Sequence, residues 1–504
     1  MASNGNLVIL INPWIQRPGY PLYLPSENLG LGYLASFLRK HSVSVEIIDA
    51  NMQELSASQV VRRVASNGPA VIGISLAAEH VKEVAELARA LKASLPDVHI
   101  TVGGRFATLS HMSILQCHCC IDSVVRGDGE LTLLDLVRTL ERGLGLDGVL
   151  GLSFRGPDGQ PCVNERRFPL ANLDQLPWPA RDTLSYVQTL GHNWATQLST
   201  SRGCYGQCSF CDVPVIYNGC WRARSERDVI EEIRWLRQEY GVSLIRLTDD
   251  DFIGAGQNGC RRASRLARML VQEGLDIQLM IAAQANRVEY DLFALLHEAG
   301  VVDCLVGVES GVDRILGLYR KGTTVRQNLR AIETLRRIGI RLNLAFIMFD
   351  PRMTLTELQK NYVFLESNGL LTVDALRSRL WLLDGTSVSN ELRTTTRVFE
   401  GGKQSSWALD AYQDAAVADV LEIVRKCSML TYDLDLEIYA GLKFGALAEF
   451  QVEQLQSNNL ELWKTIFRNA IEDPICFDFE WVAKESSQLR AQVSTMASAN
   501  QSKE

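Results

Sequence analysis

Three cysteines stand close together in the middle of the chain, within a short segment that also contains two glycines. Residues 203–211 read GCYGQCSFC, so Cys204, Cys208 and Cys211 follow the spacing C-x3-C-x2-C. Three thiolates can bind three irons of a four-iron cluster, which normally takes four cysteines, so the fourth iron stays open to a ligand from outside the protein. Structural zinc takes four protein ligands, and no fourth Cys or His follows at zinc-finger spacing. Cys220 is the nearest further cysteine and keeps the zinc alternative open.

The length and composition of the chain restrict the classes of protein to which it can belong. Its 504 residues suffice for about three domains. The net charge is −8 and no basic run is present, which disfavours nucleic acid as a partner. No apolar run approaches the roughly 20 residues of a membrane span, and the polar N-terminus lacks a secretory signal. Twelve cysteines in a chain of this length indicate reduced thiols, so we expect a cytoplasmic protein with no membrane partner.

Strand and helix patterns alternate over residues 1–145. Apolar runs of strand length are separated by segments whose apolar residues recur every three or four positions. Such alternation predicts an α/β fold with a doubly wound, Rossmann-like parallel sheet, whose binding crevice lies at the carboxyl ends of the strands. No G-x-G-x-x-G follows the first strand, so a dinucleotide ligand is disfavoured. The predicted strands are residues 7–11, 43–48, 70–75, 99–102 and 121–125.

The rest of the chain divides into three parts. Residues 146–192 are rich in glycine and proline, which predicts a small hairpin followed by an extended linker. The alternation resumes over residues 193–390, where six strand–helix units predict a partial (β/α)6 barrel of the TIM type with its site at the strand ends. Residues 391–504 have a mostly helical pattern without a metal or nucleophile motif. The predicted barrel strands are residues 196–200, 244–248, 277–282, 304–308, 341–347 and 375–382.

The cysteine loop resembles the signature of the radical S-adenosylmethionine (radical SAM) enzymes, in which an aromatic residue, here Phe210, precedes the third cysteine. The resemblance implies a [4Fe–4S] cluster whose open iron binds the amino and carboxylate groups of SAM. An electron from a donor such as flavodoxin or ferredoxin then breaks a carbon–sulfur bond of SAM and releases a 5′-deoxyadenosyl radical. Strings after the predicted strands also match this family, above all VESG at residues 308–311. They imply that SAM is held by Phe210, Asp249, Asp250, Gln284, Arg287, Glu309 and Ser310.

The chemistry of these side chains agrees with the implied roles. The acidic string DDD at residues 249–251 can accept hydrogen bonds from the SAM ammonium group, although it can also cap the following helix. Arg287 can pair with a carboxylate through two parallel hydrogen bonds. A buried carboxylate at Glu309 needs a hydrogen-bond donor, which the ribose hydroxyls of SAM can supply.

Three strings in the N-terminal region resemble the cobalamin-binding domain that precedes many radical SAM domains. They are PSENLGLGYLASFL at residues 25–38, VGGR at residues 102–105 and VRGDGE at residues 125–130. The resemblance implies cobalamin as a cofactor, and the glycines let the backbone come close to a bulky ligand. The candidate cobalamin contacts are Ser75, Gly103, Gly104, Gly127 and Glu130.

One string of the cobalamin domains is missing. Many of them carry Asp-x-His-x-x-Gly, whose histidine binds cobalt from below, and this sequence does not contain it. We therefore predict cobalamin without a histidine ligand on its lower face. His80 is the only candidate that the order of the predicted elements places nearby.

A corrinoid and a radical generator in one chain resemble the cobalamin-dependent radical SAM C-methyltransferases. The resemblance implies that one SAM methylates cobalamin, while a second yields the radical that activates an unreactive carbon, which then takes the methyl group from methylcobalamin. The expected substrate is a small-molecule or peptide natural-product intermediate. Two alternatives stay open: a radical rearrangement, cyclisation or oxidation without methyl transfer, and a non-catalytic corrinoid or redox sensor.

Overall fold

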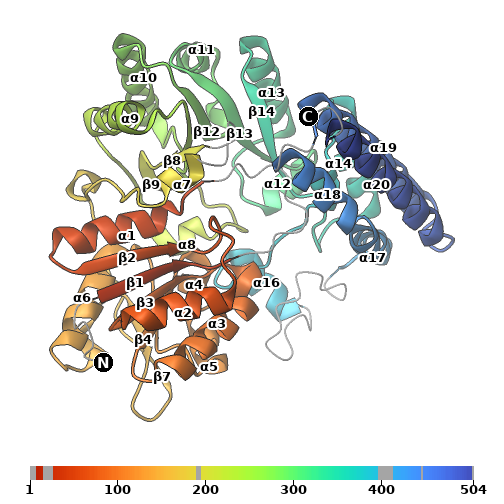
Figure 1. The fold of residues 1–504 in the computed structure, drawn as a ribbon. Coiled ribbons are helices and arrows are strands. Elements are labelled where there is room, and N and C mark those ends of the chain that lie inside the picture. The colour runs from red at the N-terminus through yellow and green to blue at the C-terminus, as the bar shows by residue number, and fades with distance from the viewer. Residues whose placement is uncertain (1–6, 15–25, 189–194, 396–411, 444–446, 502–504) are drawn as a thin grey trace.

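The computed structural model describes residues 7–14, 26–188, 195–395, 412–443 and 447–501. Along the chain, a first sheet with its helices precedes a second sheet with its helices, and a helical region follows (Figure 1). The predicted boundary between linker and barrel, at residue 192, lies outside the described residues. Within the described ranges, no helix has the length and apolar character to cross a membrane.

The first sheet contains all five strands predicted for residues 1–145. Its order is β2-β1-β3-β4-β5-β6-β7, and the first five strands run parallel. This order places the carboxyl ends of β1, β3 and β4 side by side, where a parallel sheet offers its binding crevice. The five strands are β1 (Leu7–Asn12), β2 (Ser44–Asp49), β3 (Val71–Ser75), β4 (His99–Gly103) and β5 (Ser123–Val125).

Helices cover both faces of this sheet. Val8 and Leu10 of β1 belong to the core on one face, with α1 and α6, whereas Ile9 and Ile11 belong to the core on the other face. This division follows because successive side chains of a strand point to opposite faces. The helices are α1 (Leu29–Lys40), α2 (Ala57–Asn67), η1 (Ala78–His80), α3 (Val81–Ser94), α4 (Arg105–Leu109), α5 (His111–Cys117) and α6 (Gly129–Glu141).

The hairpin predicted for the linker extends the first sheet. It consists of β6 (Leu152–Arg155) and β7 (Pro161–Val163), and β6 pairs antiparallel with β5. Over the described residues the sheet therefore has seven strands. The described remainder of the linker contains two short helices, η3 (Leu173–Gln175) and α7 (Leu184–Gln188); η2 (Leu146–Gly148) precedes the hairpin.

The second sheet is parallel and has the order β14-β13-β12-β11-β8. Its strands are β8 (Thr196–Leu198), β11 (Leu244–Leu247), β12 (Gln278–Gln284), β13 (Val301–Glu309) and β14 (Arg341–Phe346). The helices that follow the strands are α9 (Glu226–Tyr240), α10 (Gly256–Glu273), η4 (Ala285–Arg287), α11 (Tyr290–Glu298), α12 (Asp313–Leu318), α13 (Val325–Ile338) and α14 (Leu355–Ser367).

The predicted sixth barrel strand, residues 375–382, is wrong in its bounds. Residues 373–377 form a helical turn, α15 (Val373–Arg377), because the Thr372 side chain accepts a hydrogen bond from the Ala375 backbone and begins a helix. Only an isolated parallel bridge, between Phe349 and Arg379, stands where the sixth strand would pair. The described part of this sheet therefore has five strands.

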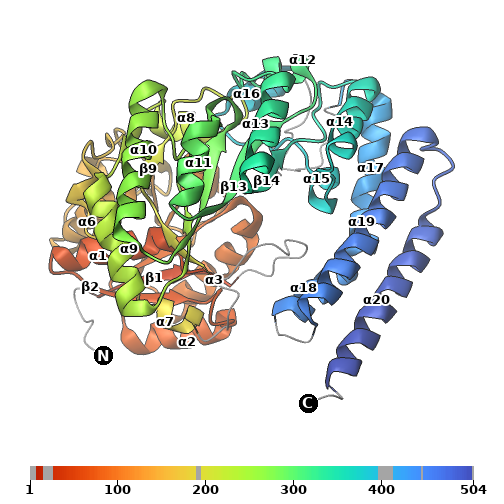
Figure 2. The same ribbon diagram turned by 90° about the horizontal axis from the view of Figure 1, so that it is seen from above.

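The described part of the C-terminal region is helical, as the sequence pattern predicts. Figure 2 shows α17, α19 and α20 side by side, beyond α14. Val420 and Val424 of α17 and Trp463 of α19 are buried in the same hydrophobic core as the second sheet, so these helices continue the barrel core. The helices are α16 (Ser387–Thr395), α17 (Ala415–Leu430), α18 (Tyr432–Lys443), α19 (Glu449–Glu472) and α20 (Phe479–Gln501).

Candidate active site

The three cysteines lie in a loop that leaves the second sheet near its first strand. The loop is bordered by a small antiparallel sheet of β9 (Ser201–Gly203) and β10 (Trp221–Ala223), with α8 (Val213–Tyr217) between them. The backbone N–H of Gly206 donates to the Cys204 sulfur at 3.2 Å. A Cβ atom at Gly206 would lie 3.3 Å from the Cys204 sulfur and 3.7 Å from the Cys208 sulfur. Glycine therefore leaves the space between these two sulfurs open, as a cluster in this loop requires.

Burial keeps the three thiols protonated until a metal binds. It raises the pKa of Cys204 to about 11 and that of Cys211 to about 12, and it raises the pKa of Cys208 as well. Metal binding removes these protons, because the thiolate is the ligand. Among the described residues, no three His, Cys, Asp or Glu side chains converge on a point that could hold a single ion. The described residues therefore give no support to the zinc alternative with Cys220.

The end of the loop is fixed from two other parts of the barrel. The Ser209 backbone N–H donates to the Tyr319 carbonyl at 2.8 Å, and its hydroxyl donates to the Leu318 carbonyl at 2.9 Å. The Ser209 carbonyl accepts from the Val388 backbone at 3.0 Å. The Phe210 ring meets the Tyr319 ring edge-on, with 5.2 Å between the centroids. The aromatic residue before the third cysteine thus packs the loop against the end of α12.

Of the three consecutive aspartates, the two that we predicted as SAM contacts have partners on the strand before the cysteine loop. Asp249 accepts hydrogen bonds from the backbone N–H groups of Thr200 and Ser201, at 2.7 and 3.0 Å, and from the Thr200 hydroxyl. Asp250 accepts from the Gly203 backbone at 3.2 Å. Both carboxylates therefore hold β9 in place, directly before Cys204.

The third aspartate, Asp251, faces the cysteines. Its Oδ2 atom lies 3.9 Å from the Cys204 sulfur and accepts from the Gln284 side chain at 3.1 Å, and Gln284 also lies 3.5 Å from that sulfur. Its Oδ1 atom is buried and has no hydrogen-bond partner in the described part of the chain. Burial raises the pKa of Asp251, and the nearby backbone N–H groups of Gly254 and Ile253 and the charge of Arg287 oppose this shift. Asp251 is thus the aspartate whose carboxylate lies beside the cluster loop.

The sequence indicates an aspartate at the site but does not show that it is Asp251. Three adjacent carboxylates predict that one of them acts at the site. The turn that follows β11 decides which of the three it is. The Arg287 Nε atom is likewise buried without a hydrogen-bond partner among the described residues. A carboxylate ligand such as that of SAM would satisfy this guanidinium.

Glu309 and Ser310 end β13 and point to different partners. Glu309 forms a buried ion pair with Lys321 at 2.8 Å, and the Lys321 ammonium lies 6.0 Å from the centre of the Phe210 ring. The Glu309 backbone has a φ of +64°, a strained conformation for a residue with a side chain. The Ser310 hydroxyl donates to Asn361 at 2.9 Å. Glu309 therefore stays beside the cysteine loop, and Ser310 ties β13 to α14.

A cavity lies between the two sheets. It holds about 1350 Å³ of empty space, its open mouth included. On one side are the carboxyl ends of β1, β3, β4 and β5 with the starts of α1 and α6, and on the other are residues around the cysteine loop, among them Arg202, Tyr217 and Asp250. All five predicted cobalamin contacts line this cavity: Ser75, Gly103, Gly104, Gly127 and Glu130.

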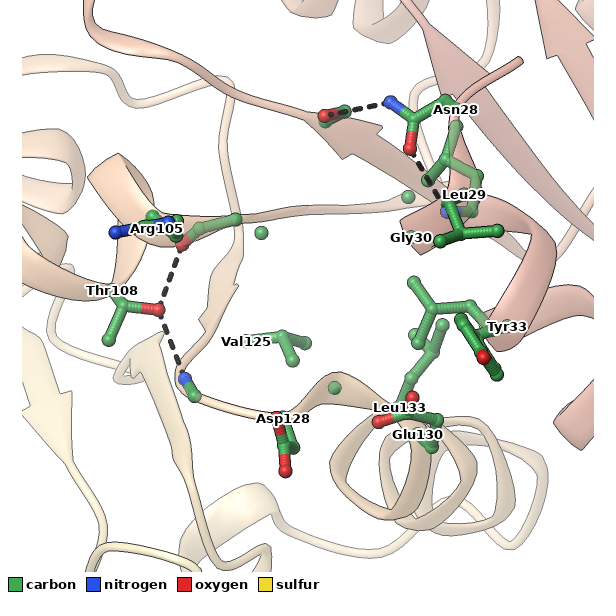
Figure 3. Close-up of a pocket in the computed structure, with 18 of the residues that line it drawn as sticks. Asn28, Leu29, Gly30, Tyr33, Arg105, Thr108, Val125, Asp128, Glu130 and Leu133 are labelled. Carbon is green, nitrogen blue, oxygen red and sulfur yellow. Dashed lines mark hydrogen bonds between the residues drawn. The ribbon is translucent and has the colours of Figure 1, made fainter. Parts of the chain in front are cut away.

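The rim of the cavity depends on glycine and on one threonine. Gly104 has a φ of +116°, and a Cβ atom there would lie 3.1 Å from the Leu76 carbonyl oxygen. The Thr108 hydroxyl donates to the Gly104 carbonyl at 2.8 Å and accepts from the Gly127 backbone at 3.0 Å. Figure 3 shows these bonds on one side of the cavity, opposite Asn28 and Tyr33. Thr108 and Asn28 were not among the predicted residues: no string of the sequence singles out Thr108, and Asn28 lies within the string at residues 25–38 without having been named as a contact.

Glu130 closes the cavity toward the barrel. Its carboxylate accepts from Arg202 at 2.7 Å, and Arg202 lies 4.8 Å above the centre of the Tyr33 ring. Arg202 is two residues before Cys204. The residues that resemble a cobalamin loop are therefore joined directly to the strand that carries the cysteines.

No histidine is among the described residues that line the cavity. His80, the candidate raised by the sequence, is buried where η1 meets α3 and is not part of the lining. We therefore expect that the cob(II)alamin form of the protein shows the same electron paramagnetic resonance (EPR) spectrum in the wild type and in His80→Ala, with no nitrogen splitting from that residue. Splitting that disappears in His80→Ala would contradict this prediction, whereas splitting that persists would come from the cofactor's own base or another nitrogen.

Comparison with known proteins agrees with this geometry. Residues 22–137 match the model of the B12 binding domain, and residues 198–365 match that of the radical SAM superfamily. The uncharacterized methyltransferase PH0819 of Pyrococcus horikoshii is 32% identical over 340 residues, which are 67% of this chain and 72% of that protein. Cytidylyl-2-hydroxyethylphosphonate methyltransferase of Streptomyces wedmorensis is 27% identical over 418 residues, 72% of this chain and 77% of the relative.

Two solved structures share the fold. The cobalamin-dependent SAM radical enzyme OxsB, with aqua-cobalamin and SAM bound, matches 98% of this chain and 76% of its own, with a TM-score of 0.78 at 22% identity. The radical SAM methyltransferase TsrM of Kitasatospora setae, with cobalamin and a [4Fe–4S] cluster, matches 78% of this chain and 76% of its own, with a TM-score of 0.63 at 18% identity. Two domains, a cysteine loop that leaves room for a cluster and a cavity lined by the predicted cobalamin contacts thus agree with the relatives: the chain belongs to the cobalamin-dependent radical SAM methyltransferases, whose cofactors are a [4Fe–4S] cluster, SAM and cobalamin.

Proposed function

We propose that this chain moves a methyl group from SAM, by way of cobalamin, to an unactivated carbon of a small-molecule or peptide natural-product intermediate. One observation carries the proposal: Asp250 lines the cavity, and the same carboxylate accepts a hydrogen bond from Gly203, the residue before Cys204. A methyl carrier in the cavity and a radical source on the cysteine loop would therefore act on one substrate. Transfer to a carbon radical requires this proximity.

When bound, the cluster and SAM supply a radical that removes hydrogen from carbon, and cobalamin carries the methyl group. The chain's own residues hold and orient these groups. Cys204, Cys208 and Cys211 bind three irons, which leaves the fourth for SAM. The Asp251 carboxylate, whose Oδ2 atom lies beside Cys204, would accept from the SAM ammonium group, and Arg287 would pair with the SAM carboxylate.

The remaining SAM contacts follow from the position of β13 and from the aromatic residue of the loop. Glu309 is held beside Phe210 by Lys321, so its carboxylate is available to the ribose hydroxyls. Gln284 donates to Asp251 and keeps that carboxylate next to Cys204. Asp249 and Asp250 bind backbone N–H groups and set the position of the cysteine strand. Ser310 binds the Asn361 side chain and sets the position of β13.

The test is an anaerobic reconstitution with hydroxocobalamin, a reductant and SAM that carries a deuterated methyl group, added to a metabolite and peptide extract of the source organism. We expect a product that gains the labelled methyl group, together with deoxyadenosine. Deoxyadenosine and a changed product without the label would establish a rearrangement, cyclisation or oxidation instead. Corrinoid binding with neither deoxyadenosine nor label would establish a sensor.

The proposal includes a protein electron donor and a cytoplasmic location. SAM cleavage needs one electron, and small acidic carriers such as flavodoxin or ferredoxin deliver electrons of low potential. We expect that reduced flavodoxin or ferredoxin replaces the chemical reductant in the same assay. Deoxyadenosine that forms only with the chemical reductant would exclude both carriers.

A further inference from the structure

One guanidinium group reaches from the cobalamin cavity to the cysteine loop. Arg105 is the first residue of α4 and follows the Gly103-Gly104 turn that lines the cavity. Its Nε atom donates to Asp212 at 2.7 Å and a second nitrogen donates to the other oxygen of that carboxylate. Its third nitrogen donates to Asp250 at 2.8 Å. A single side chain of the first domain therefore binds two carboxylates of the barrel.

These two carboxylates stand at the two ends of the cysteine loop. Asp212 directly follows Cys211, the last of the three cysteines. Asp250 accepts from the backbone of Gly203, which directly precedes Cys204, the first of them. Arg105, Asp212 and Asp250 together, here called the Arg105 bridge, thus fasten both ends of the loop to the rim of the cavity.

We infer that Arg105 is a positioning residue that couples occupation of the cobalamin cavity to the [4Fe–4S] cluster. The inference rests on the proposed function, in that it takes cobalamin as the occupant of the cavity. Lysine could not replace arginine here without loss, because only the planar guanidinium donates to both carboxylates at fixed angles.

The exposure of Arg105 provides the coupling. Its side chain keeps 50% of its surface exposed, although each of its three nitrogens donates to Asp212 or Asp250, and it lines the cavity. An occupant of the cavity covers this surface and removes water from it. Less water means a lower effective dielectric constant, so every charge of the Arg105 bridge acts more strongly on the neighbouring cluster. The bridge holds one cation and two carboxylates, so its summed charge is negative and corrinoid binding lowers the cluster's reduction potential, while the Arg105 cation limits that fall.

The experiment is an EPR-monitored redox titration of the cluster, with and without hydroxocobalamin, in the wild type and three variants. Arg105→Gln removes the charge and the bridge, and Arg105→Lys keeps only the charge. The matched control is Arg39→Gln. Arg39 also binds one carboxylate, Asp182, through two nitrogens and is 37% exposed, but it is not part of the cavity lining.

We expect Arg105→Gln to have a lower cluster potential than the wild type and Arg39→Gln, and to show a larger fall in potential on corrinoid binding than either of them, because the two carboxylates are left without their cation. The cluster potential of Arg105→Lys should lie between those of Arg105→Gln and the wild type. If Arg105→Gln assembles no cluster, Arg105→Lys is compared with the wild type and Arg39→Gln in its place. Equal potentials in the Arg105 variants and Arg39→Gln, with and without corrinoid, would overturn the inference. If the wild type retains no corrinoid, the proposed function fails, while the corrinoid-free potentials still decide whether Arg105 acts on the cluster.

Discussion

Cys204→Ala is expected to abolish deoxyadenosine formation and most of the cluster iron, and to leave a folded protein that still binds corrinoid. The cysteine lies in a loop, and removal of its thiolate leaves one iron without its protein ligand. The cavity, in contrast, is built on the first sheet, whose core does not include the cysteine loop. Iron and sulfide content, the visible spectrum, the corrinoid that remains after desalting, and deoxyadenosine by chromatography together measure this result.

Cys220→Ala is the matched control for that variant. Cys220 is exposed and directly precedes β10, whose pairing with β9 needs only backbone atoms. We expect Cys220→Ala to keep its iron and its deoxyadenosine formation. A loss of cluster iron equal to that of Cys204→Ala would show that a fourth cysteine binds the cluster, and the open iron for SAM would then be wrong.

Arg181→Leu is expected to lower the stability of the whole chain by about 3–5 kcal/mol, because it leaves the buried Glu27 without its cation and takes from the buried Glu232 one of its two cations, the other being Arg224. Arg181 belongs to the linker, and its side chain is 1% exposed. It binds Glu27 of the first domain and Glu232 of α9, the latter at 2.9 Å, and both carboxylates are buried as well. The linker arginine therefore joins the two sheets through charges that have no access to water.

The measurement is the midpoint of unfolding in urea, with the first domain and the barrel followed by separate probes. Arg39→Leu is the control, since Arg39 and Asp182 are both partly exposed, at 37% and 35%, and such pairs contribute about 0–1 kcal/mol. Equal losses of stability in the two variants would contradict the account. They would mean that the buried Glu27–Arg181–Glu232 network stabilises the protein no more than an ordinary surface ion pair does.

Much of the fold could be predicted from local patterns. The apolar runs and helical periodicities of residues 1–145 predict five strands that the structure contains, because burial on one or both faces leaves a periodic trace in the sequence. The prediction of the sixth barrel strand was wrong because it, too, relied on a local pattern. Residues 375–382 have a strand-like composition, but Thr372 caps a helical turn there and only Arg379 pairs with the neighbouring backbone.

The sequence motifs of the site could be predicted, but the spatial arrangement of its residues could not. The cysteine spacing and the glycine turns are local, so the sequence reveals them. Asp251 could not be separated from Asp249 and Asp250, because the turn after β11 decides which carboxylate meets Cys204. The Arg105 bridge joins residues that are 107 and 145 positions apart. No periodicity reports a contact of that kind, which arises only when two separately folded sheets meet.

The role of cobalamin as methyl carrier is the central claim, and the mass of the corrinoid tests it most directly. The reconstituted protein is incubated under reducing conditions with SAM that carries a deuterated methyl group, and its corrinoid is then extracted in the dark and weighed by mass spectrometry. The account predicts a retained corrinoid that carries the deuterated methyl group. A protein that retains no corrinoid, or a retained corrinoid that stays unlabelled, would contradict it.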